Sequence, residues 1–497
     1  MRGAAIIVLA LLAACAPVPR EKADNPVNQR AQIEDALRSD IATLASDDFG
    51  GRQPGTEGEA KTLRYLSRAW QVAGLESGTN DPAHPWFAPV ELAFTTPAVG
   101  TLKVVRSGRQ IALPTGSAMV YTSGARGLIE RAPVLFVGNA GAGLDQSELA
   151  GRVAMMLWDH EGDVEQREAL LRAGASAVLA VVADDDELAH LAEERRRGLY
   201  RLAGTDAIST IDGYVTRDAA ERMVGATRFA NLVQAASQAD FKPVPLRISA
   251  SIEATSDIGT ARSFNLIGKL PGKRPRDGAV LILAHWDHFG SECAPPGAAD
   301  RICNGAVDNA SGVAVMTELA RKLGSGPKLD RDVYFLATTA EERGLLGAEA
   351  FTENPPIPLD TIVAAFNLDS VAIAPGGSPV AIVGKGLTTL DAAVEKIVRE
   401  SGREMGDETV ASQFVRRQDG WALLQHDVPA ISVSSAYASG KPFDKFMAER
   451  YHKPSDEIGG IELGGAVDDT LLHIRLVRFF ANTLDWPGST KNIPPAH

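Results

Sequence analysis

The stretch AVLILAHWDH, residues 279–288, joins a run of apolar side chains to a cluster of polar ones. Its apolar part, Ala279–Ala284, has the length of a strand that is buried on both faces of a sheet. His285, Asp287 and His288 follow directly. Ligands of open α/β sheets bind beyond the carboxyl ends of the strands. The stretch therefore predicts a buried parallel strand that ends in a polar site.

The residues downstream repeat this strand pattern and alternate it with helices. Further apolar runs of strand length lie at 333–338, 362–368 and 430–434. Helical periodicity separates or follows them at 310–322, 344–353, 387–401 and 465–485. Such alternation predicts an α/β fold, in which helices cover both faces of a mainly parallel mixed sheet.

The residues upstream show a different pattern of apolar and polar side chains. Segment 31–75 shows two helical stretches around a loop, whereas 92–246 consists of short β-rich runs with one helix near 165–173. We interpret the acidic run 184–187 as a solvated loop. Because the β-rich part interrupts two helical regions, we expect it to be an insertion. The expected segments are a signal peptide (1–14), a tether (15–29), the N-terminal part of the main α/β domain (30–96), an inserted mostly β domain (97–247) and the main α/β domain itself (248–488).

The first residues resemble an export signal. Arg2 precedes an apolar run, 4–14, that is too short to span a bilayer permanently. Leu12-Ala13-Ala14-Cys15 resembles a bacterial lipobox, which implies that Cys15 is lipidated and tethers the protein to a membrane. The alternative is an ordinary secretory signal that is cleaved after Ala13-Ala14. Both interpretations predict an exported protein, either in the cell envelope (periplasm, lipid-anchored) or secreted.

Composition excludes several classes of protein. The 497 residues include 50 Lys and Arg against 63 Asp and Glu, so the formal charge of −13 argues against binding to nucleic acid. Three cysteines are too few for a disulfide-rich scaffold or a zinc-ribbon array. In an oxidising compartment Cys293 and Cys303 could form a disulfide, and two free thiols are the alternative.

Imidazole and carboxylate groups lie at or after the expected strand ends. They are His285, Asp308, Glu341, Glu342 and Asp369, and His452 follows later in the chain. A set of N and O donors without thiolate suits zinc, manganese or cobalt. One carboxylate shared by two ions would give a two-metal site. In the pair Glu341-Glu342 one carboxylate can bind metal while the other transfers a proton.

Five motifs, in order, resemble the co-catalytic zinc aminopeptidases of the M28 peptidase family over 263–460. They are His-x-Asp at 285–287, Asp-Asn-Ala-Ser-Gly at 308–312, Glu-Glu at 341–342, Asn-Leu-Asp at 367–369 and Tyr-His-x-Pro at 451–454. The resemblance implies a zinc-exopeptidase fold, two Zn²⁺ per chain and peptide substrates. Residue by residue, it implies one zinc on His285 and Asp369, a second on Glu342 and His452, and Asp308 as the bridge.

The same resemblance implies roles around the metals. Glu341 would be the general base, Asp287 would orient the imidazole of His285, and Tyr451 would stabilise the oxyanion, with Tyr437 as a weaker alternative. His288 and Asp456 are interpreted as structural support. The sequence departs from the family pattern at Val307, where many members have an acid, and at Asp419-Gly420-Trp421, which replaces a common Asp-His pair.

Segments 132–138, 149–153 and 174–175 resemble the protease-associated (PA) domain, which is often inserted in such enzymes. Three other functions stay open at this point. A glutaminyl cyclase would use a single zinc with nearly the same polar residues, a non-catalytic protein would only bind peptides, and the PA-like part could carry the main function as an interaction module. The pattern specifies no oligomeric state.

Overall fold

The computed structural model describes residues 26–139, 144, 146–158, 163–205, 209–238, 240–294 and 297–488. The expected signal peptide (1–14) and Cys15 lie outside these ranges. Within them, no helix combines the length and the apolar character that crossing a membrane requires. The first helix, α1 (Pro26–Leu44), begins inside the segment that was expected to be a tether (15–29).

The first part of the molecule is built on a mixed, mainly parallel sheet. Its strands lie in the order β14 (Ala381–Val383), β15 (Ala430–Ser434), β13 (Ile362–Asn367), β11 (Ala279–His285), β12 (Asp332–Thr338) and β10 (Val244–Leu270). β11 pairs in parallel with β12 and β13, and β13 pairs in parallel with β15. β10 and β14 run antiparallel to their neighbours. This arrangement confirms the predicted sheet.

Helices cover both faces of this sheet, as predicted. Residues of α1, α2 (Glu57–Val72), α8 (Gly312–Gly324), α10 (Asp391–Glu400) and α14 (Gly464–Phe480) share one buried cluster with Val280 and Ile282. Leu281 and Leu283 point to the opposite face and pack with residues of α9 (Leu346–Glu353) and α12 (Gly420–Leu424). Successive strand residues alternate between faces, so the unbroken apolar run of β11 serves both layers.

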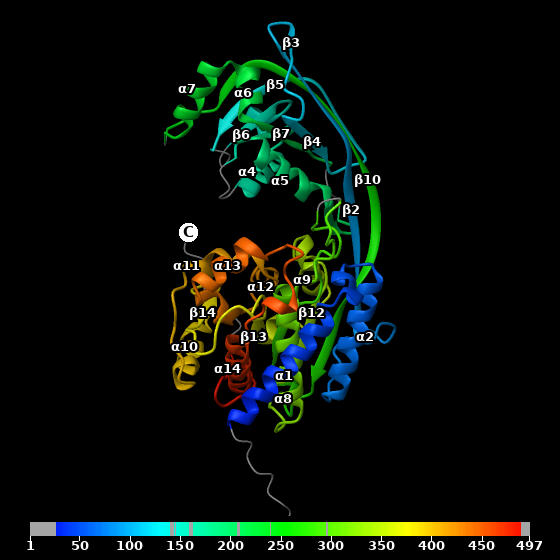
Figure 1. Cartoon of the computed structure of the whole chain (residues 1–497), viewed down its shortest axis with the longest axis vertical. Coiled ribbons are helices and arrows are strands. Elements are labelled where there is room, and N and C mark those ends of the chain that lie inside the picture. Colours follow the sequence, from blue (N-terminus) through cyan, green and yellow to red (C-terminus); the bar gives the residue numbers. More distant parts are fainter. Residues whose placement is uncertain are drawn as a thin grey trace, which may run out of the picture.

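Two long strands carry the chain to the second part of the molecule (Figure 1). β2 (Phe87–Arg106) and β10 pair antiparallel from Phe87 and Leu266 at one end to Arg106 and Ile248 at the other. There β5 (Arg126–Gly138), β6 (Val153–Leu157), β7 (Ala177–Val182) and β9 (Ile211–Thr216) form parallel pairs, and β4 (Ala118–Thr122) lies antiparallel to β9. The shorter strands are β1 (Glu76–Ser77), β3 (Arg109–Ile111) and β8 (Leu199–Leu202).

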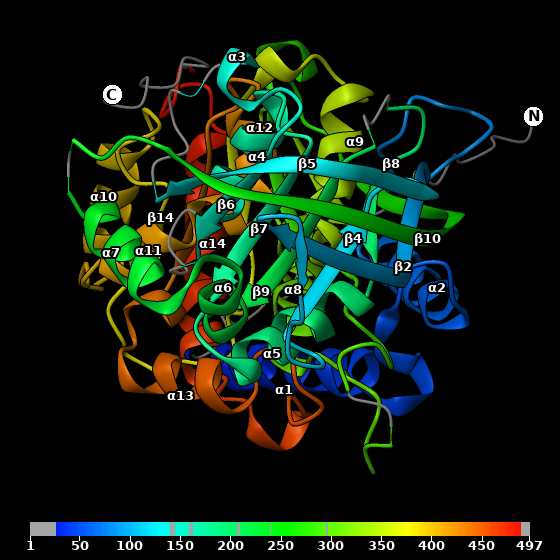
Figure 2. The same ribbon diagram turned by 90° about the horizontal axis from the view of Figure 1, so that it is seen from above.

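The second part contains more helix than the sequence predicted. Its described residues form α3 (Gln146–Leu149), α4 (Asp163–Arg172), α5 (Asp185–Arg196), α6 (Arg217–Val224) and α7 (Ala226–Ala236), which pack around the strands (Figure 2). The run 184–187 is not a loop but the start of α5. The Asp184 side chain accepts the backbone N–H groups of Asp186 and Glu187, and the acids of the first turn face the positive end of the helix dipole.

The loop between β11 and α8 contains the two cysteines. Cys293 and Cys303 form a disulfide, with Cα atoms 6.2 Å apart. Of the two states that the sequence left open, the structure has the bonded one. The first part of the molecule also contains α11 (Thr409–Gln413) and α13 (Lys441–Glu449), which precedes His452.

Candidate metal centre

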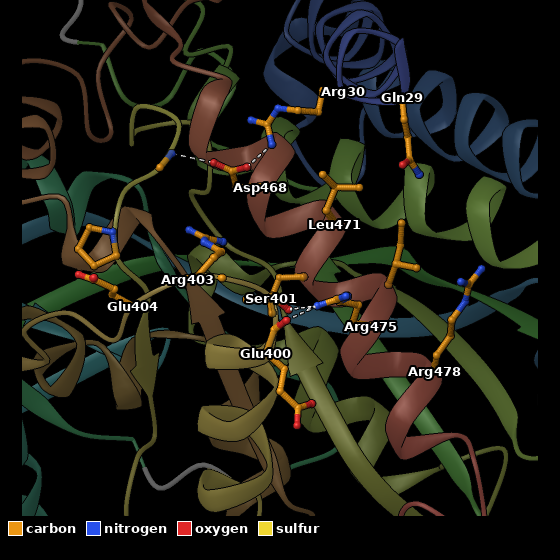
Figure 3. Close-up of a pocket in the computed structure, with 15 residues that line it drawn as sticks. Gln29, Arg30, Glu400, Ser401, Arg403, Glu404, Asp468, Leu471, Arg475 and Arg478 are labelled. Atoms are coloured by element: carbon orange, nitrogen blue, oxygen red, sulfur yellow. Dashed lines mark hydrogen bonds and ion pairs between the residues drawn. The ribbon is translucent and has the colours of Figure 1, made fainter. Parts of the chain in front are cut away.

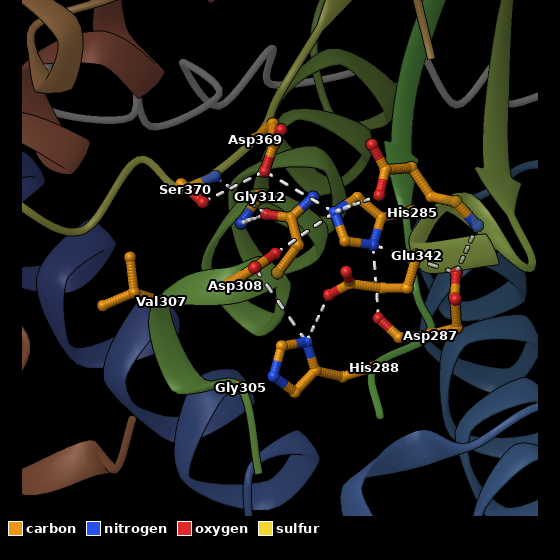
Figure 4. A network of polar contacts seen from close by, with 12 residues as sticks. His285, Asp287, His288, Gly305, Val307, Asp308, Gly312, Glu342, Asp369 and Ser370 are labelled. Carbon is orange, nitrogen blue, oxygen red and sulfur yellow. Dashed lines mark hydrogen bonds and ion pairs between the residues drawn. The ribbon is translucent and has the colours of Figure 1, made fainter. Parts of the chain in front are cut away.

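The five expected metal ligands come from separate segments and meet at one edge of the sheet, and Figure 4 shows four of them, His285, Asp308, Glu342 and Asp369. His285 is the last residue of β11, Asp308 lies in the turn before α8, and Glu342 and Asp369 follow β12 and β13. His452 follows α13. The carboxyl ends of parallel strands share one edge, so side chains far apart in sequence converge there. All five side chains are at least largely buried, with His452 the most exposed at 27%.

Asp308 lies between the two histidines. Its Oδ1 is 3.3 Å from Nε2 of His285, and its Oδ2 is 3.4 Å from Nε2 of His452. Burial alone would raise the pKa of Asp308, but the neighbouring imidazoles of His285 and His452 hold it well below its usual value. Each oxygen of this carboxylate therefore faces a different imidazole.

The remaining ligand-type groups divide between these two sides. Asp369 Oδ1 lies 3.5 Å from Nε2 of His285, and Glu342 Oε2 lies 3.2 Å from Nε2 of His452. Two groups of three ligand atoms, those of His285, Asp308 and Glu342 and those of His285, Glu341 and Asp369, each lie within 4.8 Å of one another. Burial and Asp308 raise the pKa of Glu342, yet His452 and His288 outweigh them and bring it to about 2.

The donor set fits a divalent cation. The groups are imidazole nitrogens and carboxylate oxygens, and buried Nε2 of His452 has no hydrogen bond within the described residues. Several carboxylates buried side by side are unfavourable unless positive charge compensates them. Bound cations would supply this charge and give the Nε2 atom a partner.

Asp287 contacts the centre differently from the expectation. Nδ1 of His285 is 3.2 Å from the backbone carbonyl of Asp287, whereas the Asp287 carboxylate oxygen Oδ1 lies 3.8 Å from that nitrogen. Oδ1 instead accepts the backbone N–H of Glu341 at 3.1 Å. Burial raises the pKa of Asp287 to about 7. The residue thus fixes both the imidazole and the turn that carries Glu341.

Tyr451 and Tyr437 both line the cavity at the centre. The Tyr451 ring stacks on His452 with centroids 3.7 Å apart, and its hydroxyl accepts a hydrogen bond from Arg417 Nη2 at 3.2 Å. The Tyr437 hydroxyl donates to the backbone carbonyl of Asp369 at 3.3 Å. Tyr437 is therefore occupied in positioning a ligand segment, while the Tyr451 hydroxyl retains its own proton for donation.

The cavity has one polar and one apolar wall. Its empty volume is about 330 Å³. His285, Asp308, Glu341 and Asp369 form the polar wall, and the apolar wall consists of Phe414, Phe443, Phe446 and Met447. A substrate held at the polar groups could place an apolar side chain against these rings.

The sequence around the centre matches a known protein family. Residues 265–472 match the sequence profile described as Peptidase family M28. This segment is a peptidase family M28 domain. The match confirms the resemblance that the motifs indicated. It includes all five expected ligand positions and Glu341.

Two characterised relatives and one solved structure resemble this chain. Aminopeptidase YwaD of Bacillus subtilis (strain 168) is 30% identical over 198 residues, which cover 39% of this chain and 40% of that protein. The alkaline phosphatase isozyme conversion protein of Escherichia coli (strain K12) is 40% identical over 85 residues, 16% of this chain and 23% of that protein. The alignments thus span less than half of either relative. An aminopeptidase from Aneurinibacillus sp. strain AM-1 shares the fold, with a TM-score of 0.57, 19% identity and coverage of 91% and 95%.

Asp456 holds the turn of the M28 domain that carries Asp308. Its Oδ2 accepts the backbone N–H groups of Val307 at 3.1 Å and Asp308 at 3.0 Å, and Arg450 donates to its Oδ1 at 2.9 Å. These contacts agree with the structural support expected of it. His288 was also expected to be structural support. It contacts one of the expected metal ligands directly, because its Nδ1 is 2.5 Å from Oε1 of Glu342.

Arg52 supports the centre and was not singled out by its sequence. Its fully buried guanidinium donates to four backbone carbonyls, those of Leu44, Trp286, Asn304 and Gly305. Burial lowers its pKa to about 10, although Asp308 counteracts this effect. The cation therefore joins the N-terminal segment to the loops on both sides of the metal ligands.

Replacement of Arg52 by methionine is expected to lower the free energy of unfolding by about 3 kcal/mol or more, because four buried carbonyls would lose their donor. Urea denaturation of the purified protein measures this change. Arg68→Met, at an exposed position of the neighbouring helix α2, is the control and should cost about 0.5 kcal/mol or less. Equal costs for the two variants would show that the buried network contributes little.

Proposed function

We propose that this chain is a zinc-dependent aminopeptidase that removes N-terminal residues from peptides. The observation that carries the proposal is the position of Asp308, whose two carboxylate oxygens each face a different histidine within 3.4 Å. A carboxylate placed in this way suits a bridge between two cations. The M28 domain and the partial likeness to an aminopeptidase support the same activity.

The proposed ligands form two sets that share Asp308. His285 and Asp369 would hold one zinc ion, and Glu342 and His452 would hold the other. When bound, two such ions lower the pKa of a water molecule and polarise the substrate carbonyl. His288 would fix the Glu342 carboxylate through its contact with Oε1.

Glu341 is the proposed proton carrier. Burial raises its pKa well above the usual value, and the negative charges of Glu342 and Asp419 add to this effect against the opposing His285. A raised pKa suits a group that takes a proton from water and passes it to the leaving amine. Its Oε2 lies 3.9 Å from Nε2 of His285, at the polar wall of the cavity.

Tyr451 is the proposed oxyanion donor. Burial raises the pKa of its hydroxyl well above 10, so the proton stays in place at neutral pH. Arg417 donates to the same oxygen and thereby favours donation of the hydroxyl proton toward a developing negative charge. Asp287 is proposed to position both His285 and the turn of Glu341.

Two features outside the centre belong to the same proposal. Residues 97–247 would be an inserted domain of the PA type. Two buried hydrophobic clusters, formed mostly by residues of this segment, support a separate domain. Lipidation at Cys15 would tether an exported enzyme to a membrane of the cell envelope. Residues 30–96 and 248–488 would together form one catalytic domain. The buried hydrophobic cluster that α1 and α2 share with β11 and α14 supports this assignment.

The proposal is tested by measuring bound metal per chain together with hydrolysis of aminoacyl-p-nitroanilides. We expect two zinc ions, chelator-sensitive release, and faster hydrolysis of leucyl or methionyl than of lysyl substrates because the side-chain wall is apolar. Substrates with an acetylated amine should not be cleaved. A single zinc without release from any substrate would contradict the hydrolase and favour a cyclase. No metal and no release would favour a binding protein.

Metal removal should also change how stability depends on pH. Burial raises the pKa of Asp287 to about 7 and that of Asp419 to about 6, so each stabilises the metal-free fold below about pH 4 and loses this effect as pH rises through those values. The pKa of His452 is raised to about 9, so its contribution to the stability of the metal-free fold is also lost as pH rises, between about pH 6.5 and 9. The chelated protein should therefore melt at a lower temperature at about pH 8 than at about pH 5.5.

Zinc binding becomes stronger as pH rises, because protons compete for the ligands at low pH. The difference in melting temperature between loaded and chelated protein should thus grow from about pH 5.5 to about pH 8. Calorimetry of both forms measures it. A difference that shrinks over this range would contradict the assignment of these groups to a metal centre.

A further inference from the structure

One end of the molecule lies opposite the metal centre and has a distinct surface. The metal ligands follow the carboxyl ends of β11, β12 and β13, so the opposite edge of the sheet is where these strands begin. Figure 1 shows that α1 starts at this end and that α2, α8 and α14 finish there, away from the second part of the molecule. We call this end the basal face.

The basal face carries exposed cations in a protein whose formal charge is −13. They are Lys273, Arg274, Arg276, Lys328, Arg475 and Arg478. Hydrogen bonds connect their segments, because Arg274 donates to Thr483 Oγ1 at 3.0 Å and the backbone N–H of Lys273 donates to the carbonyl of Leu329 at 2.9 Å. The acids among them are Asp277, Asp330 and Asp485, and Glu400, Glu404 and Asp468 lie near Arg475 and Arg478.

Three of these cations have no partner that would neutralise them. Within the described residues, the side chains of Lys273, Lys328 and Arg478 form no salt bridge or hydrogen bond. Arg475 donates only to neutral groups, the carbonyl of Glu400 at 3.0 Å and Ser401 Oγ at 2.9 Å. Figure 3 shows Arg475 and Arg478 along α14 at the rim of a hollow with an empty volume of about 1700 Å³.

Large aliphatic side chains are also exposed at this end of the molecule. Val72 at the end of α2 is 85% exposed, Leu484 after α14 is 86% exposed, and Val27 at the start of α1 is 72% exposed. A Cβ added at Gly324 would touch the carbonyl of Ala73, which places the end of α2 against the end of α8. Exposed aliphatic side chains surrounded by Lys and Arg are typical of surfaces that lie on a bilayer.

We propose that the basal face docks on a membrane surface through anionic phospholipid headgroups. Lys and Arg would meet the headgroups, while Val72 and Leu484 would enter the interfacial layer. The site of the proposed lipid anchor agrees, since Cys15 precedes Pro26 by 11 residues, which span about 40 Å at most. Docking in this orientation turns the metal centre away from the bilayer.

Vesicle co-sedimentation of the chain from residue 16 onward tests the docking without the lipid anchor. This chain retains every residue that the structure describes. We expect binding to phosphatidylcholine vesicles with roughly one third phosphatidylglycerol, and little binding to phosphatidylcholine alone. The combined variant Lys273→Glu, Lys328→Glu and Arg478→Glu should weaken binding at least about tenfold.

A matched variant separates the basal face from general electrostatic attraction. Lys103→Glu, Arg109→Glu and Arg131→Glu change the charge equally at exposed positions in the second part of the molecule, and they should leave vesicle binding within about twofold. Both variants should hydrolyse soluble substrates like the parent, since neither contains a residue of the metal centre. Absent binding to anionic vesicles, or equal loss in the two variants, would overturn the proposal. Lost hydrolysis in the parent chain would instead contradict the proposed function.

Discussion

Replacing Glu341 by glutamine is expected to lower kcat by about 10³-fold or more while the protein keeps its metal and its fold. The amide has nearly the same shape as the carboxylate, but it cannot accept the proton that the attacking water must release. General acid–base groups contribute about 10² to 10⁴-fold to catalysis. Glu341 would act twice, first as base and then as acid toward the leaving amine, so the effect should lie at the upper end of that range.

The control for this variant is Glu349→Gln on α9, an exposed glutamate near the same strand end, which should keep full activity. Single-turnover kinetics, metal content and melting temperature are measured on both proteins. Loss of zinc from the Glu341 variant would reassign this residue as a ligand, an arrangement compatible with the grouping of His285, Glu341 and Asp369. Unchanged kcat with retained zinc would remove it from the mechanism.

The sheet and most metal-binding groups could be predicted because one local pattern determines both. A short apolar run such as Ala279–Ala284 has the length of a strand covered on both sides, and parallel strands bring their carboxyl ends to a common edge. Groups that directly follow such runs are then neighbours, whatever their separation in sequence. His285 and Asp369 were placed by this logic. His452 follows no strand, so the sequence offered it as a second imidazole donor, and the resemblance to the family gave it its place beside Glu342.

The supporting residues could not be predicted because their partners are backbone atoms. Arg52 donates to four carbonyls from segments up to 253 positions away, and any residue type offers a carbonyl. Asp287 shows the same limit, since its backbone oxygen and not its carboxylate accepts from His285. The helices of the second part were underestimated for a different reason. Their start signals, such as the Asp184 cap, lie in polar runs that also suit loops.

Changing Asp308 to asparagine is expected to abolish measurable peptidase activity, with a loss of at least about 10³-fold, because both proposed metal positions depend on this one side chain. One of its oxygens would become an NH₂ group, which repels a cation and cannot bridge two of them. The backbone N–H groups of Val307 and Asp308 would still bind Asp456, so the turn should keep its shape.

Metal content distinguishes a bridge from an ordinary ligand. His452→Asn should reduce zinc from two ions to about one per chain, because His452 contacts only the Glu342 side of the centre. Asp308→Asn should reduce the occupancy of both positions, and the exposed Asp360→Asn should change neither. If the Asp308 variant retained as much zinc as the His452 variant, this carboxylate would serve a single ion. The distances of 3.3 and 3.4 Å to the two histidines would then reflect packing around one metal instead of two.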